Sequence, residues 1–247
     1  MTAPTDARLD SSAQKLTVAD VNPVLVSGKP FNTTTNVRTF ASNYGTMLQH
    51  WNGFDLTTAV RAAHGLNAGG GVTFGRTMTD NCDVIKQLPE LIGPTPVEYC
   101  HNVSGWEPQY KAFAAYTMPW QHVRVSGNMQ SLVGPALQAG ANYSGADLAP
   151  AIGRPFSAGA AGLKTVNVLR PSSVYGDRLN QLDLRFSRIF RIGHGSLDAN
   201  VDLYNAFNSD AVLGYNTAYA GVNGGAWLKP TAIIQGRILK FGARWDF

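Results

Sequence analysis

The fold is indicated most clearly by the C-terminal sequence "LKFGARWDF", Leu239–Phe247. Apolar or bulky side chains occupy every second position, and polar residues or glycine stand between them. Because side chains two residues apart share one face of a β-strand, this pattern predicts a strand with one apolar and one polar face. Chain ends normally fray, so such an end is expected to be ordered or recognised. The apolar set comprises Leu239, Phe241, Ala243, Trp245 and Phe247.

The same two-residue period recurs along the chain. It is clear in "FDLTTAVR" (54–61), "LNAGGGVTFGRT" (66–77), "HVRVSGNMQS" (122–131) and "SLDANVDLYNAFN" (196–208). Alternation of this kind is typical of strands that face two different environments. We therefore predict antiparallel strands, each pairing with the next, near residues 47–61, 66–79, 107–118, 121–133, 179–192, 196–208 and 232–247.

Two of these segments are less clear. Residues 107–118 fit either orientation, because Tyr110 and Tyr116 lie on one side of the strand and Phe113 lies on the other. Residues 179–192 also fit a basic amphipathic helix, with apolar residues at helical spacing. We favour a strand for the second segment because another strand-like segment follows after only "GHG", a connection typical of a hairpin.

The connections between the predicted strands alternate strictly between short and long. The short ones fall at residues 62–65, 118–121 and 193–195, and the long ones at 80–106, 134–178 and 209–230. Outer-membrane barrels have short turns at one end and long loops at the other. A soluble sandwich has no reason to sort its loops in this way, so the alternation favours a membrane barrel.

The composition agrees with a β protein of this kind. Of the 247 residues, 44% are hydrophobic and only 15% are charged, against a usual charged fraction of about 25%. A membrane-spanning strand needs ~9–11 residues, whereas a helix needs ~20 mostly apolar ones, and no such run is present. A soluble β protein remains an alternative. The net charge is +4, but the basic residues are spread along the chain, so we expect no nucleic-acid partner.

The two cysteines, Cys82 and Cys100, fall in one long connection. Neither belongs to a CxxC pair and only His101 adjoins them, so a zinc site is not expected. A disulfide in an oxidising compartment would contribute about 3 kcal/mol to stability in the loop-entropy model. Two unpaired thiols are the alternative that the sequence leaves open.

Motifs for catalysis are missing from the sequence. The five histidines are scattered, and no HExxH, GxSxG or phosphate-binding loop is present. Asp198 and Asp202 share one strand face, but a polar barrel lining explains them better than acid–base chemistry. Arg185, Arg188 and Arg191 do not share one face, so they do not suggest a phosphate grip. We expect no enzyme activity, no metal and no cofactor.

Several motifs carry a family resemblance. "DLYNAFNS" (202–209), "GDRLNQLDLRFSRIFRIG" (176–193) and a last strand ending in Phe247 resemble the C-terminal barrel strands of TonB-dependent outer-membrane receptors. The similarity is greatest to the Oar-like subgroup, whose members carry a carboxypeptidase-regulatory-like domain. "WNGFDLTTAVR", "GRTMTDNCDV" and "GGAWLKPTAII" resemble that subgroup too, so the resemblance extends from about Val37 to the C-terminus.

The resemblance implies an all-β fold, an antiparallel meander of about seven to eight strands that forms part of a transmembrane outer-membrane β-barrel. Residues 1–46 would be an N-terminal loop or partial strand region, with a weak strand candidate at Val37–Tyr44, and residues 47–247 would be barrel strands. Partners would be outer-membrane lipid and the barrel-assembly machinery. An aromatic girdle is expected near the short turns, at Tyr116, Trp120, Trp245 and Phe247.

The resemblance also assigns a role to the C-terminus. Phe247 would be the key residue of the signal that the assembly machinery recognises, and the outward face would comprise Trp245, Ala243, Phe241 and Leu239. The alternative is an ordinary amphipathic edge strand, which would invite aggregation.

Family members also have a plug, a TonB box and about 22 strands, and none of the plug or a signal peptide is recognised here. We therefore expect the C-terminal barrel portion of a transport receptor, located in the cell outer membrane, which meets TonB only through a missing N-terminal part. One alternative is a small independent outer-membrane barrel or surface adhesion protein, closed by an N-terminal strand. A soluble β-rich binding module is another.

Overall fold

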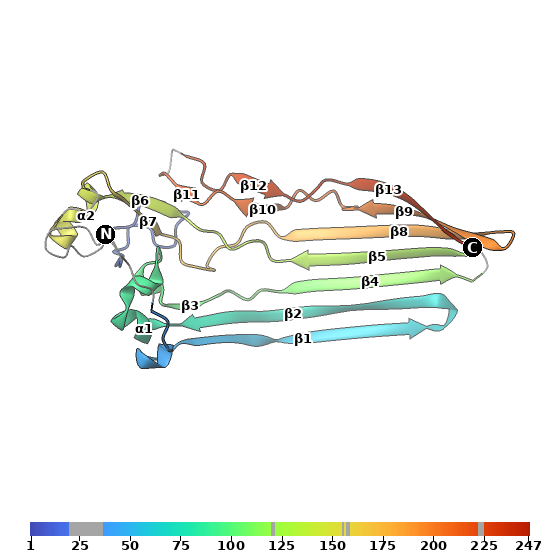
Figure 1. Ribbon diagram of the computed structural model, residues 1–247, viewed down its shortest axis with the longest axis horizontal. Helices are drawn as coiled ribbons and strands as arrows, with labels where there is room; N and C mark the ends of the chain where they lie inside the picture. Colours follow the sequence, from blue (N-terminus) through green and yellow to red (C-terminus); the bar gives the residue numbers. More distant parts are fainter. Residues whose placement is uncertain (20–36, 120–121, 155, 157–158, 222–224) are drawn as a thin grey trace.

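Seven long strands form one antiparallel sheet in the computed structural model, which describes residues 1–19, 37–119, 122–154, 156, 159–221 and 225–247. Each strand pairs with the next long strand along the chain, as the sequence predicted (Figure 1). Residues 179–192 form a strand and not a helix. The strands, in sheet order, are β1 (Leu48–Ala62), β2 (Leu66–Asp80), β4 (Gln109–Met118), β5 (Val123–Leu132), β8 (Leu179–Ile192), β9 (Gly195–Tyr204) and β13 (Ile238–Asp246).

The long connections contain structure of their own, which the sequence patterns did not predict. Strand β3 pairs with β2, β6 pairs with both β7 and β11, and β10 pairs with β12. The strands are β3 (His101–Val103), β6 (Gly140–Ser144), β7 (Leu163–Asn167), β10 (Val212–Tyr215), β11 (Ala218–Tyr219) and β12 (Pro230–Ile233). The helices are α1 (Cys82–Gln87), α2 (Gly145–Ile152), η1 (Ala41–Asn43), η2 (Ala63–Gly65), η3 (Pro89–Ile92) and η4 (Val97–Tyr99).

The alternation of short and long connections sorts them to opposite ends of the sheet (Figure 1). The β1–β2 and β8–β9 turns lie at one end, together with the C-terminus, and α1, α2 and the small strands lie at the other, together with the N-terminus. The β1–β2 turn is tight because His64 and Gly65 adopt φ values of 65° and 83°. The turn between β8 and β9 is tight for the same reason, because Gly193 adopts a φ of 60°.

The strand register places most apolar residues of the seven strands on one face, although Trp51, Phe113 and Ile189 lie on the other. Residues directly opposite each other in a sheet point to the same side, so one unbroken row can be followed from β1 to β13. This row settles the orientation of β4, because Tyr110, Ala114 and Tyr116 share the parity of the row while Phe113 lies on the polar face. The row comprises Val60, Ala68, Ala114, Gly127, Leu184, Leu203 and Leu239.

Two predicted strand boundaries were wrong. The strand predicted at 196–208 ends at Tyr204, because Asn205 and Asn208 adopt left-handed φ values of 50° and 53°. The strand predicted at 232–247 is divided between β12, which pairs with β10, and β13, which ends at Asp246. Left-handed residues interrupt the alternating pleat, so hydrophobic periodicity alone does not reveal them.

The weak strand predicted at Val37–Tyr44 is also wrong, because this segment contains the short helix η1 instead. The end of the segment is held against α1. Gln87 Nε2 donates a hydrogen bond of 2.6 Å to the Tyr44 carbonyl, and a Cβ on Gly45 would lie only 2.5 Å from Asp83 Cβ. The segment therefore turns toward the long connections and adds no strand beside β1 within the described residues.

Most of the buried apolar core lies at the end with the long connections. We call this region the loop cap and define it as the described residues within 1–19, 81–108, 133–178 and 205–237. The N-terminal segment contributes Leu9 and Leu16 to the core, which also holds Tyr99, Ala139, Ala141, Val166, Val168, Leu169, Tyr219 and Trp227. Every residue of β1, by contrast, is exposed. Among the described residues no helix is long and apolar enough to cross a membrane.

Candidate functional site: the two faces of the sheet and the loop cap

The apolar face of the sheet is uncovered. Leu56 on β1 is 67% exposed and Phe241 on β13 is 72% exposed, and large exposed apolar side chains also occur on β2, β4, β5 and β8. Monomeric soluble proteins rarely expose a contiguous apolar patch of more than a few hundred Å². A face of this kind marks a surface that meets lipid or another protein.

The polar face carries paired charges. Arg185 on β8 donates to the Asp202 carboxylate on β9 over 2.5 Å from Nε and 2.9 Å from Nη2, and Asn200 Nδ2 donates to the same carboxylate over 3.2 Å. Asp198 shares the face of Asp202, as predicted, but Asp202 is engaged by the guanidinium. The described residues contain no group of acidic, histidine and cysteine side chains arranged to hold a metal.

A hollow of about 620 Å³ lies along the polar face, and its lining mixes apolar side chains such as Phe113 and Met129 with hydroxyl and amide side chains, Lys111 and Asp183. Glycines of β2 make room for it and for neighbouring rings. A Cβ on Gly69 would lie 2.8 Å from the Phe113 ring, and one on Gly75 would lie 2.2 Å from the Trp51 ring. The glycine-rich run of β2 thus lets aromatic rings lie flat against the backbone.

The C-terminal strand follows the predicted alternation. Leu239, Phe241, Ala243 and Trp245 share the face of their β9 partners Leu203, Val201, Ala199 and Leu197. Asp246 lies on the polar face, where Arg244 pairs with it at 2.8 Å. Phe247 follows the strand and is fully exposed. No described strand pairs with the outer edge of β13, and the role of this strand as an assembly signal stays a prediction.

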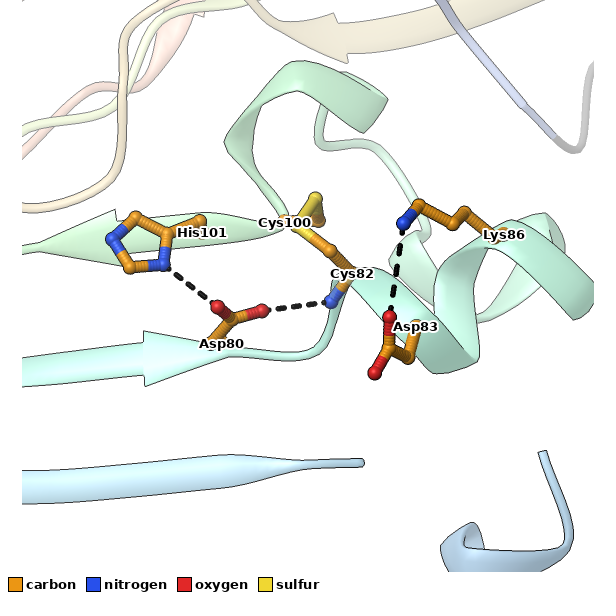
Figure 2. The surroundings of a disulfide bond; sticks show 6 residues. All are labelled: Asp80, Cys82, Asp83, Lys86, Cys100 and His101. Atoms are coloured by element: carbon orange, nitrogen blue, oxygen red, sulfur yellow. Dashed lines mark hydrogen bonds and ion pairs between the residues drawn. A yellow bond between two sulfur atoms is a disulfide. The ribbon is translucent and has the colours of Figure 1, made fainter. Parts of the chain in front are cut away.

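Figure 2 shows where the two cysteines lie. Cys82 is the first residue of α1 and Cys100 immediately precedes β3, and a disulfide joins them with their Cα atoms 4.9 Å apart. This separation lies within the limit of about 7 Å that a disulfide allows. The Asp80 carboxylate accepts a hydrogen bond from the Cys82 amide over 3.1 Å and pairs with His101 Nδ1 at 2.9 Å. The bridge ties the start of the β2–β4 connection to its return strand, at the long-connection end as predicted.

An ion pair between the buried Asp6 carboxylate and the half-exposed Arg8 side chain helps tie the N-terminal segment to the rest of the loop cap, and no sequence pattern indicated it. The Asp6 carboxylate accepts hydrogen bonds from Arg8 Nη2 over 2.6 Å and from the Tyr219 hydroxyl over 2.9 Å. The Arg8 guanidinium also lies 4.7 Å from the centre of the Trp227 ring. Hydrogen bonding from Arg8 holds the pKa of Asp6 far below its ordinary value. Burial, and then the hydrogen bond to Asp6, raise the pKa of Tyr219.

Asn205 is a second residue that the sequence patterns missed, although it belongs to the "DLYNAFNS" motif. It is 2% exposed, and its Nδ2 donates to the carbonyl groups of Ser209 over 2.9 Å and Gln235 over 2.8 Å. Asn208 Oδ1 accepts from the Arg237 amide over 3.0 Å. These two asparagines hold the returning chain beside the end of β9. Paired asparagines at a strand end are a turn signal that could have located them.

The three arginines of β8 lie on different faces, as predicted. Arg185 is on the polar face, whereas Arg188 is on the apolar face, with its guanidinium 5.0 Å from the centre of the Phe190 ring. Of the predicted aromatic girdle, Tyr116 and Trp245 lie on the apolar face near the short turns, while Trp120 falls outside the described residues.

Comparisons with protein-family models, with curated proteins and with solved structures each found no match to this chain. The functional argument therefore depends on the faces of the sheet, its edges and the loop cap.

Proposed function

We propose that this chain supplies consecutive wall strands of an outer-membrane β-barrel in a TonB-dependent transport receptor. The observation that carries the proposal is the continuous apolar face of the seven-strand sheet, which no described segment buries, together with the polar face opposite. In the proposed orientation, the apolar face meets lipid and the polar face lines a hydrated lumen.

The free energy of burying apolar surface away from water also supports this proposal. Burying apolar surface away from water stabilises a protein by about 25 cal/mol per Å², and a water-soluble sheet gains this by covering one face. Here side chains such as Leu56 and Phe241 stay exposed, while the covered core lies in the loop cap. Insertion in lipid removes the apolar face from water without any further protein layer.

The sorting of the connections supports the same proposal. The turn between β1 and β2 spans only residues 63–65, whereas the connection between β5 and β8 spans 133–178 and contains β6, α2 and β7. The long loops, and with them the disulfide, would lie at the extracellular end. An oxidising environment there suits a bridge between Cys82 and Cys100.

The edges of the sheet bear on how much of the barrel these strands supply. Strands β1 and β13 stand at opposite ends of the strand order and do not pair with each other. Because each unpaired backbone group in lipid costs several kcal/mol, the proposal includes neighbouring strands from the rest of the barrel at both edges. A small independent barrel would need β1, β13 or an N-terminal strand to close the sheet, and the described residues contain no such pairing.

The experiment that tests the lipid orientation uses two neighbouring alanines of β4. Ala114 lies opposite Ala68 and Gly127 on the apolar face, while Ala115 lies opposite Asn67 and Ser126 on the polar face. The complete gene product that contains these strands is fused to an export signal and produced in a Gram-negative host, and each alanine is replaced by lysine in turn. Recovery of the protein in the outer-membrane fraction is then measured.

Ala114→Lys should lower recovery strongly, because a lysine on the lipid face near the midplane costs about 2–4 kcal/mol. Ala115→Lys should leave recovery nearly unchanged, because its side chain faces water in the lumen. Equal recovery of the two variants, or recovery of the parent chain as a soluble monomer, would reject the orientation.

The receptor part of the proposal has a separate test. In cells that produce the complete gene product, chemical cross-linking of TonB should capture protein that contains peptides of this sequence. If the lysine pair behaves as expected but TonB captures none of these peptides, the chain belongs to a barrel that TonB does not energise.

A further inference from the structure

We propose that Arg76 and Arg178 form a binding site for the phosphate group of an anionic lipid, at the boundary between the apolar face and the loop cap. The inference rests on the proposed function, because it takes the apolar face to meet lipid. It adds a specific ligand class, a phosphate monoester or diester that carries an acyl chain, to a surface otherwise expected only to contact hydrocarbon.

Both arginines lie on the apolar side of the sheet, near its long-connection end. Arg76 is two residues beyond Phe74 on β2 and therefore shares its face. Arg178 immediately precedes β8, and its guanidinium lies 5.8 Å from the centre of the Tyr110 ring on β4. The short segment 106–108 connects the two positions, because Arg76 stacks on Trp106 and Arg178 Nη2 donates to the Pro108 carbonyl.

Arg76 is held by aromatic contact. Its guanidinium lies 5.0 Å from the centre of the Trp106 ring, and that ring stacks on Phe74 with centroids 4.8 Å apart and planes within 5°. Arg76 itself is exposed, and no carboxylate of the described residues forms an ion pair with it. A guanidinium held over an aromatic ring can still offer N–H groups to a bidentate anion.

Among the described residues, Arg178 is held by hydrogen bonds in addition to an aromatic contact, unlike Arg76. Its Nη1 donates to Ser131 Oγ over 3.2 Å, in addition to the contact with Pro108. The nearest acidic residue along this segment is Glu107, whose carboxylate accepts a hydrogen bond from the Tyr175 hydroxyl. No ion pair joins Glu107 to Arg178 among the described residues. Two cations without acidic partners thus flank one short segment at the edge of an apolar surface.

A lipid fits this arrangement better than a free anion. The phosphate would bind the two guanidinium groups, and the acyl chain would lie against exposed apolar side chains next to them. Phe54, which contacts Phe74 at a centroid distance of 5.6 Å, is 57% exposed and extends the surface onto the edge strand β1. Inorganic phosphate has no group to occupy that part of the surface.

The experiment measures binding to the full chain solubilised in a zwitterionic detergent. Lysophosphatidic acid, lysophosphatidylcholine with the same acyl chain, and inorganic phosphate are each titrated, and binding is followed by ³¹P NMR. Lysophosphatidic acid should bind at least about tenfold more tightly than either of the other two. Arg76→Gln should weaken its binding by about tenfold, the effect of one charge-assisted hydrogen bond.

Arg61→Gln is the matched control, because Arg61 is an exposed arginine on the polar face of β1, and its binding should equal that of the parent. Trp106→Leu should also weaken binding, since it removes the ring that orients Arg76 while keeping an apolar side chain. Circular dichroism identifies any variant that has lost the sheet. The proposal is overturned if Arg76→Gln binds like the parent, if Arg61→Gln weakens binding equally, or if inorganic phosphate binds as tightly as the lipid.

These outcomes are separate from those of the Ala114 and Ala115 test. If lysine is tolerated equally at both alanines but lysophosphatidic acid still depends on Arg76, the wall proposal fails while the phosphate site stands. If the lysine pair behaves as expected and Arg76→Gln has no effect, the wall proposal stands and the phosphate site is rejected.

Discussion

The sheet and the loop cap differ in the solvent exposure of their apolar residues. Leu56 in β1 is 67% exposed, whereas Leu169 in the cap is 1% exposed. In the first case leucine lies on a face that no described segment covers, and in the second it lies in a core that the chain covers by itself. The cap therefore buries its apolar side chains by its own packing, whereas the sheet leaves one apolar face open.

The sheet and the loop cap also differ in how far apart in the sequence their contacting segments lie. In the sheet, almost all neighbours are consecutive long strands joined by ladder hydrogen bonds. In the cap, contacts join segments that are far apart in the sequence, as when Asp6 accepts from Tyr219 or Ser11 donates to the Val168 carbonyl. The N-terminal segment thus belongs to the cap and not to the seven-strand sheet.

The strongest test of this comparison makes the same substitution in both regions. Leu169→Ala should lower the free energy of unfolding of the cap by about 2–5 kcal/mol, because it leaves a cavity in a closed core. Leu56→Ala should change it by less than about 0.5 kcal/mol in detergent, because the side chain is not packed in protein. Denaturant titration followed by limited proteolysis of the cap measures both. Equal losses would contradict the division into two regions.

Reduction of the disulfide should have the next largest effect, again confined to the cap. Opening the loop between Cys82 and Cys100 should cost about 3 kcal/mol and make residues 83–99 sensitive to protease. Cys82→Ser should reproduce the effect without a reductant, and the strand content by circular dichroism should not change. A mass measurement that finds two free thiols in exported protein would remove this contribution.

The C-terminal strand offers a smaller test on the side of the sheet. In the exported protein, deletion of Phe247 or Phe247→Lys should reduce the outer-membrane level several-fold, because the assembly machinery would lose its terminal aromatic. Asp246→Asn is the control, since Asp246 lies on the polar face beside Arg244, and its level should be close to that of the parent. Equal levels for all variants would exclude the assembly-signal role.

The smallest expected effect is the pH dependence of the cap. The pKa of Asp6 is lowered in the folded protein by hydrogen bonds from Arg8, so its ionised form stabilises the fold. This stabilisation is fully present above the ordinary aspartate pKa of about 3.9 and is lost as the pH falls through the lowered folded value. Asp6→Asn should flatten the pH profile of cap unfolding below about pH 4. An unchanged profile would show that the ion pair contributes nothing.

Much of the sheet could be predicted from local sequence patterns. Two-residue periodicity located most of the seven long strands, and the short connection after residue 192 favoured a strand over a helix at residues 179–192. Both signals are local or nearly so, because pleat alternation and hairpin turns involve residues close together in the chain. A disulfide between Cys82 and Cys100 could be considered for the same reason, since both lie in one connection, but the sequence left two unpaired thiols open and the structure shows the bridge.

The ends of β9 and β13, the orientation of β4 and the composition of the cap could not be predicted from the sequence. They became known only from the three-dimensional structure. Asn205 stops β9 by a left-handed backbone and by bonds to Gln235, thirty residues away. The partners Asp6 and Tyr219 are separated by 213 positions. Long-range contacts of this kind produce no periodic pattern in the sequence. The partner of each residue depends on tertiary packing and not on the position of the residue in a strand. The neighbours of Arg76 and Arg178 at the edge of the apolar face became visible for the same reason only in the folded chain.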